Sequence, residues 1–252
     1  MKSIVLLGTG NVGTNLFNAL KETRGFKVIQ VYNHRKNSLN NFKNVPTTTK
    51  FEEIADADIY LIAVKDDFIL NVSQSLRGKN ALVIHTSGGK SIDILNTHTR
   101  RGVFYPLQTF SKQRIIDFDN LPVCIEAISK NDLKILEDLA KELKGKVYHI
   151  NSAQRKSLHV AAVFVNNFTN LLYTEAEEIC LKNDVPFEIL LPLINETASK
   201  VGFMRPIEAQ TGPALRNDRE VIKAHLEQLN SQQKEIYNLL TKSIQNLHGK
   251  EL

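Results

Sequence analysis

Three glycines near the N-terminus have the spacing of a phosphate-binding turn. Gly8, Gly10 and Gly13 follow the apolar run Ile4–Leu7 and precede a helical pattern over residues 14–21. In dinucleotide-binding proteins, the first glycine makes a tight turn and the second lets the backbone approach a pyrophosphate. The third glycine lets the helix pack closely against the strand. The alternative is a tight strand-to-helix turn that binds nothing.

Further cofactor contacts are expected where the helix begins and where neighbouring strands end. Asn11 and Val12 lie at the expected helix N-terminus, whose free N–H groups and positive dipole end favour phosphate. Val64 and Lys65 end one apolar strand, and Thr86 ends the next. Ligands of open α/β sheets bind outside the carboxyl ends of the strands. We therefore expect these five residues to contact the cofactor.

The end of the second expected strand favours NADP over NAD. NAD-specific sites place Asp or Glu about 20 residues after the glycine turn, where it binds the ribose 2′-hydroxyl. Here that position holds Asn33, and Arg35 follows it. A guanidinium group binds a 2′-phosphate well, because it is planar and permanently charged. The alternative is that Arg35 is a solvated surface residue.

A polar stripe marks the first expected helix of the C-terminal part. When residues 153–183 are projected as one α-helix, His159, Asn166 and Asn170 fall along one line. His159 is the candidate proton donor, because an ordinary histidine pKa near 6.5 suits proton exchange at neutral pH. Asn166 would orient the substrate and Asn170 would bind it. The alternatives are a solvent-facing stripe and a purely structural histidine.

A second candidate substrate contact lies further along the chain. Gly212 and Pro213 break the helical pattern, and Thr211 and Arg216 flank this break. Both side chains could reach an anionic ligand. The alternative is a turn between helices that carries polar surface residues.

Composition excludes several functional classes. The chain has 252 residues, of which 42% are hydrophobic and 23% charged, with a net charge of +5. Without a block of Lys and Arg, we expect no nucleic-acid partner. Cys124 and Cys180 are far apart and have no His/Cys cluster beside them, so we expect no metal site and no disulfide. No apolar run approaches the roughly 20 residues that span a bilayer, and a strand begins almost at once. We therefore expect a cytoplasmic protein without a membrane contact or signal peptide.

The order of the elements predicts two domains. Apolar strands alternate with helices up to about residue 150, and only helical patterns follow. This order indicates an α/β fold: a Rossmann domain with a doubly wound parallel sheet over residues 1–150, then an all-α domain over residues 151–252. The helical part has more than one apolar stripe, so we expect it to form a homodimer, most simply a two-fold one.

Several stretches together resemble a known family. They are Gly8–Gly13, Asn33–Arg35, His85–Gly88, Pro106–Phe110, His159–Val163 and Thr211–Asp218. The chain resembles Rossmann-like NADP oxidoreductases with a C-terminal helical domain of unknown function. Its first half is similar to deazaflavin-dependent NADP oxidoreductases and pyrroline-5-carboxylate reductases. More distantly, the chain resembles 6-phosphogluconate and 3-hydroxyisobutyrate dehydrogenases.

The resemblance implies a fold, a cofactor and a dimer, because related families pair their helical domains. The family usually has His before the proline of the Pro-Leu-Gln-Thr-Phe stretch, where this chain has Tyr105. The hydroxyacid dehydrogenases use a helix lysine with an asparagine further along, for which His159 and Asn166 are the candidates here. We therefore expect an NADP-dependent oxidoreductase that acts on a small carbonyl, imine or hydroxyacid compound between its two domains. The alternative is a non-catalytic NADP-binding sensor or structural protein.

Overall fold

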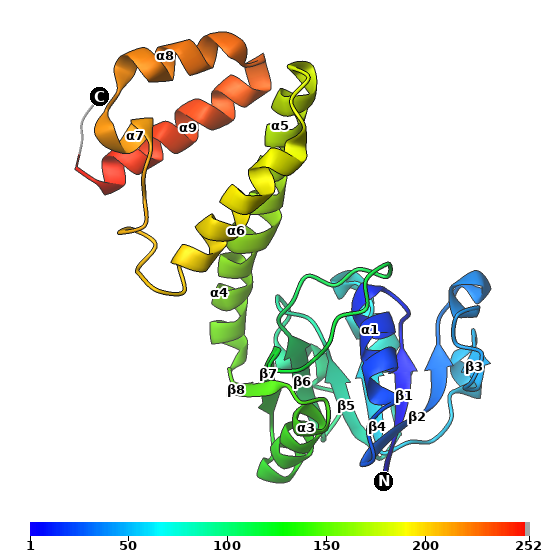
Figure 1. Ribbon diagram of the computed structural model, residues 1–252. Helices are drawn as coiled ribbons and strands as arrows, with labels where there is room; N and C mark the ends of the chain where they lie inside the picture. Colours follow the sequence, from blue (N-terminus) through cyan, green and yellow to red (C-terminus); the bar gives the residue numbers. More distant parts are fainter. Residues whose placement is uncertain (250–252) are drawn as a thin grey trace. The chain divides into compact units, whose positions relative to one another are not determined.

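The chain divides into two compact units. The computed structural model describes residues 1–249, and the units divide between Asn166 and Asn167 (Figure 1). The first unit contains the whole sheet and the helix that follows it, and the second unit is helical. The predicted change from strands to helices at residue 150 coincides with the end of the last strand at His149.

An eight-stranded sheet forms the centre of the first unit, in the order β3-β2-β1-β4-β5-β6-β7-β8. The strands are β1 (Lys2–Leu7), β2 (Phe26–Tyr32), β3 (Thr47–Thr48), β4 (Ile59–Ile62), β5 (Leu82–His85), β6 (Arg101–Pro106), β7 (Pro122–Ala127) and β8 (Lys146–His149). From β3 to β6 all pairs are parallel, in the strand order of a Rossmann fold. The predicted Rossmann fold is therefore confirmed.

The last two strands differ from the expectation of a purely parallel sheet. β7 runs antiparallel to β6, and β8 runs parallel to β7. The physical reason is the connection after β6, which contains no helix and returns at the same edge of the sheet, with Pro106 opposite Val123. A connection of this kind leads to an antiparallel neighbour, whereas a parallel one needs a crossover.

Helices cover both faces of the sheet. α1 (Asn11–Leu20) and α3 (Lys130–Glu142) pack on one face, where Leu16 and Leu136 join Ile4 and Leu6 in one core (Figure 1). α2 (Ile69–Gln74) lies in the core of the other face. The remaining short helices of this unit are 3₁₀ turns: η1 (Lys36–Leu39), η2 (Phe51–Glu53), η3 (Asp66–Phe68) and η4 (Ile92–Leu95).

A long helical run begins after β8. A capping box between Asn151 and Gln154 starts α4 (Ser152–Ala162), which continues into a π-helical segment, η5 (Val163–Phe168), and then into α5 (Thr169–Lys182). The predicted helix over residues 153–183 is thus present, with one difference. The wider π-helical turn changes the angle between successive residues, so a regular α-helical projection cannot be carried through it.

The second unit buries very little apolar surface. Its other helices are η6 (Phe187–Leu190), α6 (Leu191–Lys200), α7 (Pro213–Arg216), α8 (Arg219–Gln228) and α9 (Ser231–Leu247). Among its described residues, the only buried hydrophobic ones are Cys180 and Ala214, whereas Phe203 and Leu239 are 89% and 68% exposed. Helical domains are stabilised by burying an apolar stripe on each helix. No helix within residues 1–249 is long and apolar enough to cross a membrane.

Candidate functional site

Two of the three glycines of the turn are required by the fold itself. Gly8 follows β1 with φ +112°, and a Cβ there would lie 2.3 Å from the Ala63 carbonyl oxygen. A Cβ at Gly13 would lie 2.3 Å from the carbonyl oxygen of Gly8. The turn therefore packs directly against the end of β4, and α1 packs directly against the turn.

Gly10 has a different environment. It is the N-cap residue of α1 with φ −71°, and no side chain caps the helix there. No described atom outside its immediate neighbours lies within 4 Å of the position that a Cβ of Gly10 would take. Asn11 is exposed and Val12 half-buried at the first turn of the helix. This is an open helix N-terminus with unshared N–H groups, which fits a pyrophosphate.

Arg35 lies in a loop that is joined to the glycine turn. Asn33 donates a hydrogen bond of 2.7 Å from Nδ2 to Thr9 Oγ1, and its Oδ1 accepts one of 2.9 Å from the Arg35 backbone N–H. Arg35 is exposed, and its guanidinium makes no ion pair with any described residue. Asn33 therefore uses its amide to connect the two loops, while Arg35 keeps its charge available.

The other predicted cofactor residues lie where expected along the sheet. Val64 is half-buried after β4, with Cγ1 3.0 Å from the Cβ position of Gly8, and Lys65 is exposed beside it. Thr86 is buried after β5, and its backbone N–H donates to the Ile62 carbonyl. These positions border the turn and its neighbouring strand ends, and their cofactor contacts stay a prediction.

Tyr105 and His159 meet at the same edge of the sheet. Tyr105 near the end of β6 has its Oη 3.2 Å from Nδ1 of His159 on α4, and the two rings are edge to face. Gly88, after β5, packs against both: a Cβ there would lie 2.7 Å from His159 Nδ1 and 2.9 Å from Tyr105 Oη. Asp66 begins η3, which follows β4, and its Oδ2 lies 3.4 Å from the Cβ position of Gly89.

The surroundings of Tyr105 determine whether its hydroxyl is protonated at neutral pH. Burial raises the pKa of Tyr105, with smaller raising contributions from Cys124 and Asp66 and a lowering one from Arg155. Tyr105 therefore keeps its proton at neutral pH, and its O–H can donate to a neutral His159. His159 itself is exposed.

Arg155 holds α4 against the end of β5. Its guanidinium is fully buried and pairs with Glu126 on β7 at 2.5 Å. It also donates to the carbonyl oxygens of Ser87 and Lys90, at 3.2 and 2.6 Å. Because Arg155 is one helical turn before His159, these bonds fix the helix that presents the histidine. Sequence reasoning missed this residue, because its partners Glu126, Ser87 and Lys90 lie far away in the sequence.

A second histidine, at the end of β5, lies in the buried interior of the first unit. His85 ends β5, is fully buried, and its Nδ1 accepts a hydrogen bond of 3.1 Å from the Ser87 N–H. Burial, together with the charge of Arg155, lowers the pKa of His85 to about 4. His85 is therefore neutral at physiological pH, with its proton on Nε2.

Asn15 ties a distant loop to α1. Its side chain is fully buried, donates to the Ser111 carbonyl and accepts from the Ile116 N–H, both at 2.9 Å. The loop after β6 is thereby fixed beside the first turns of α1. Sequence reasoning missed this residue too, because its partners lie about a hundred residues away.

The remaining predicted substrate residues lie in the π-helical segment and in the second unit. Asn166 is half-buried in the π-helical segment, and Asn170 is exposed in α5 of the second unit. Thr211 and Arg216 are exposed in the second unit, before and within α7. The single line on which His159, Asn166 and Asn170 were projected assumed a regular α-helix, which the π-helical segment interrupts. Their contacts with substrate stay predictions.

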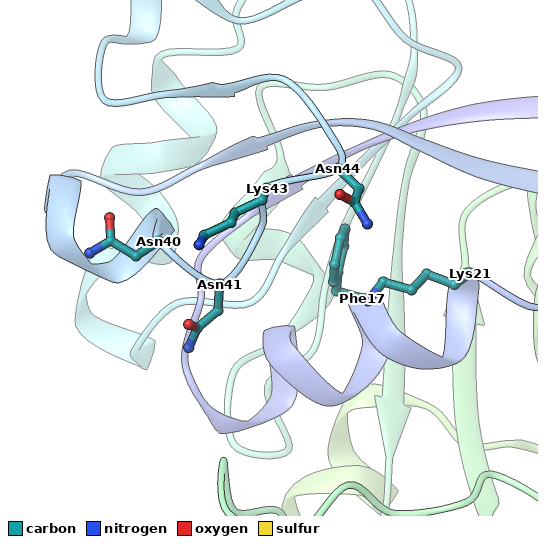
Figure 2. A pocket seen from close by; sticks show the side chains of 6 residues that line it. All are labelled: Phe17, Lys21, Asn40, Asn41, Lys43 and Asn44. Carbon is teal, nitrogen blue, oxygen red and sulfur yellow. The ribbon is translucent and has the colours of Figure 1, made fainter.

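A separate surface pocket lies beside the C-terminal half of α1. Figure 2 shows the side chains that line it: Phe17, Lys21, Asn40, Asn41, Lys43 and Asn44. Lys21 is already engaged, because its Nζ donates to Asn18 at 2.8 Å and lies 4.6 Å from the centre of the Phe17 ring. The glycine turn is at the other end of this helix, so we do not assign the pocket to the dinucleotide site. Across residues 1–249, no cluster of His, Cys, Asp and Glu could hold a metal ion.

Comparisons with known proteins agree with this architecture. Residues 121–244 match the family described as "Domain of unknown function (DUF2520)". A search of curated proteins finds no match. Among solved structures, a putative NADP oxidoreductase from Bacteroides fragilis is 41% identical, with a TM-score of 0.90, over 99% of this chain and 98% of that one.

Two more distant structures share the fold. A protein from Thermotoga maritima is 21% identical, with a TM-score of 0.72, over 98% of each chain. An imine reductase from Myxococcus stipitatus, solved with NADP⁺, is 16% identical, with a TM-score of 0.69, over 97% of this chain and 93% of that one. The 41% identity over nearly the whole of both chains shows that this protein belongs to the family of Rossmann-like proteins with a DUF2520 domain in the C-terminal half.

Proposed function

We propose that this protein is an NADP-dependent oxidoreductase that reduces a small carbonyl or imine compound, or oxidises the corresponding hydroxyacid or amine. The observation that carries the proposal is the arrangement along one edge of the sheet. The open N-terminus of α1 at Gly10 and the Tyr105–His159 pair both lie at carboxyl ends of the parallel strands. The description of the Bacteroides fragilis relative as an NADP oxidoreductase supports the same function.

NADP is the proposed cofactor. The helix N-terminus at Gly10 would bind the pyrophosphate, and the exposed guanidinium of Arg35 would bind the 2′-phosphate. No carboxylate occupies the position of Asn33, where it would repel that phosphate. The imine reductase with the same fold was solved with NADP⁺, which supports a nicotinamide cofactor here.

His159 is the proposed proton donor. The nicotinamide supplies or accepts the hydride when it is bound. When the carbon of a C=O or C=N group takes a hydride, the attached oxygen or nitrogen must take a proton. His159 is exposed at the strand ends and held by Tyr105, so it can supply that proton and recover another from solvent. Asn166 is the proposed orienting residue, and Asn170, Thr211 and Arg216 are the proposed substrate contacts.

We also propose that the protein is a homodimer through its helical unit. With Cys180 and Ala214 as the only buried hydrophobic residues among the described ones, this unit has almost no apolar core of its own. A second copy with the same unpartnered faces would cover them in a two-fold interface.

The experiment combines binding with turnover. NADPH and NADH are titrated into the protein by calorimetry, and NADPH oxidation is followed at 340 nm with a panel of carbonyl and imine compounds. The proposal requires tight NADPH binding and turnover of at least one compound. Tight binding with no oxidation across the panel would favour a non-catalytic sensor, and no binding of either nucleotide would overturn the proposal entirely.

A further inference from the structure

The Tyr105 hydroxyl contacts His159 at one ring nitrogen, Nδ1. The Oη–Nδ1 distance of 3.2 Å is a hydrogen bond, and the edge-to-face packing of the rings sets the plane of the imidazole. Gly88 closes the space on the Nδ1 side, since even a Cβ would lie 2.7 Å from that nitrogen. No described residue forms a hydrogen bond with Nε2, which is on the opposite side of the ring.

The backbone beneath this pair is rigidly held. Arg155, one turn before His159, is fully buried and donates to the Ser87 and Lys90 carbonyls, so α4 is hydrogen-bonded to the loop that contains Gly88. The groups that act electrostatically on Tyr105 are Arg155, whose charge is paired with Glu126, and Asp66 and Cys124. Neither of the last two forms a hydrogen bond with the tyrosine hydroxyl, so that Oη is left to serve the histidine.

We propose that Tyr105 is the positioning residue of His159: its hydroxyl stays bonded to Nδ1 in both protonation states of the ring, so that Nε2 is the nitrogen that exchanges a proton with substrate. A hydroxyl suits this task because it can both donate and accept. It donates to the bare Nδ1 when the neutral ring carries its proton on Nε2, and it accepts from Nδ1–H in the imidazolium and in the neutral tautomer that remains after Nε2 has given up its proton. A carboxylate could only accept, so it would hold a single tautomer. This inference rests on the proposed function of His159.

The proton balance is simple. In the reducing direction, imidazolium His159 gives its Nε2 proton to the substrate oxygen or nitrogen and becomes neutral, with the remaining proton on Nδ1 bonded to Tyr105 Oη. The hydride that completes the reduction comes from NADPH, which is oxidised to NADP⁺. Nε2 then takes a proton from water, which restores the imidazolium. Throughout this cycle the tyrosine hydroxyl accepts from Nδ1–H and keeps its own proton.

The test is NMR of the full-length protein labelled with ¹⁵N in its histidine rings. We compare wild type, Tyr105→Phe and a matched control, Tyr237→Phe, which removes the bond of 2.9 Å between Tyr237 and His225. In neutral wild-type His159, we expect the Nδ1 signal of an unprotonated, hydrogen-bonded nitrogen. Tyr105→Phe should move that signal to the position of a free imidazole and leave His225 unchanged, whereas Tyr237→Phe should do the reverse. An Nδ1 signal that is the same in Tyr105→Phe and wild type would overturn the proposal.

A second readout separates this proposal from the proposed function. With a compound that the wild type reduces, Tyr105→Phe should lower kcat by about tenfold or more, within the usual contribution of a general acid, and leave the NADPH Kd unchanged. An unchanged kcat would overturn the positioning role even if the bond is present. If no compound is reduced, the oxidoreductase function fails, while the NMR comparison still decides whether Tyr105 controls His159.

Discussion

Asn33 Nδ2 donates a hydrogen bond of 2.7 Å to Thr9 Oγ1, which joins the glycine turn to the loop that carries Arg35. The same side chain accepts a hydrogen bond from the Arg35 backbone through Oδ1. One asparagine thus sets the distance between the site proposed for the pyrophosphate and the site proposed for the 2′-phosphate. Under the proposed function, the preference for NADP would depend on this connection between the loops as well as on the charge of Arg35.

Arg35→Ala should weaken NADPH binding selectively. Hydrogen bonds to charged groups contribute about 1.5–3 kcal/mol, which corresponds to a loss of roughly 10- to 150-fold in affinity. NADH has no 2′-phosphate, so its Kd should barely change. Calorimetric titration of both nucleotides measures the effect. Equal weakening of both would mean that Arg35 only supports its loop.

Asn33→Asp should shift the preference toward NADH. The carboxylate can still accept from the Arg35 N–H, and Thr9 can reverse its hydroxyl to donate, so the connection between the loops survives. The added charge repels the 2′-phosphate and offers an acceptor to a 2′-hydroxyl. The ratio of the NADH Kd to the NADPH Kd should fall below that of wild type. A ratio that stays the same would place the ribose away from residue 33.

Substitutions at two glycines of the turn should distinguish an effect on cofactor binding from an effect on folding. Gly10→Ala adds a methyl group into open space at an ordinary φ, so the free energy of unfolding should change by no more than about 0.5 kcal/mol. NADPH affinity should fall by about tenfold or more, because the methyl group keeps the backbone away from the pyrophosphate.

Gly8→Ala is the matched contrast. Its φ is +112°, and the added Cβ would lie 2.3 Å from the Ala63 carbonyl oxygen. The substitution should therefore lower the free energy of unfolding, measured in urea, by about 2 kcal/mol or more. If Gly10→Ala were as destabilising as Gly8→Ala, a loss of NADPH affinity would reflect a disturbed fold and not a lost contact with the pyrophosphate.

Much of the first unit could be predicted from sequence because its signals are local. The run Ile4–Leu7 is buried on both faces, and the glycines follow it at once, so strand, turn and helix can be read from a dozen residues. The reversal of β7 could not be predicted, because it depends on how the loop after β6 returns, and that loop has no periodic pattern.

The candidate site was only partly predictable, for a similar reason. His159 could be selected by residue type, but its partner Tyr105 lies 54 residues away on another element. Arg155 reads as an ordinary helix charge until its partners on β7 and in the loop after β5 are known. The π-helical segment at Val163–Phe168 follows an α-helical pattern in sequence, so the phase of Asn166 and Asn170 could not be derived from spacing.

Arg155→Met should be strongly destabilising. It leaves the Glu126 carboxylate without its cation and removes the donors to two carbonyls, and breaking such a buried pair costs about 3–5 kcal/mol. The double variant Arg155→Met/Glu126→Gln should recover part of this loss, because no charge is then left unpaired. Lys134→Met, which breaks an exposed pair with Asp138, is the control and should have little effect. A double variant as unstable as the single one would mean that the carbonyl contacts, and not the ion pair, hold α4.

The helical unit should carry the dimer interface. Light scattering should give twice the 28.5 kDa mass of one chain at micromolar concentration. Leu239→Lys places a charge on an exposed apolar side chain of the second unit and should lower that mass toward one chain. Leu70→Lys makes the same change at an exposed leucine of the first unit and should leave the mass unchanged. A wild-type mass of one chain would refute the dimer.

His85 should make the protein less stable as the pH falls. Its pKa in the folded state is about 4, below the ordinary value of 6.5 that it takes in the unfolded chain. Above pH 6.5 both states are neutral and the group has no effect. Between pH 6.5 and 4, the unfolded chain binds a proton that the folded chain does not, so unfolding becomes easier. Linkage predicts a loss of about 2 kcal/mol between pH 7 and pH 5 from this group alone.

The measurement compares wild type with His85→Asn, whose amide oxygen can still accept from the Ser87 N–H at the end of β5. Urea unfolding at pH 7, 6 and 5 gives the free energy of each protein. Burial also lowers the pKa of His98, which acts in the same direction in both proteins and cancels in the difference. His85→Asn should start less stable at pH 7 and lose about 2 kcal/mol less than wild type on going to pH 5. Parallel pH profiles would mean that His85 takes up its proton in the folded state as readily as in the unfolded chain.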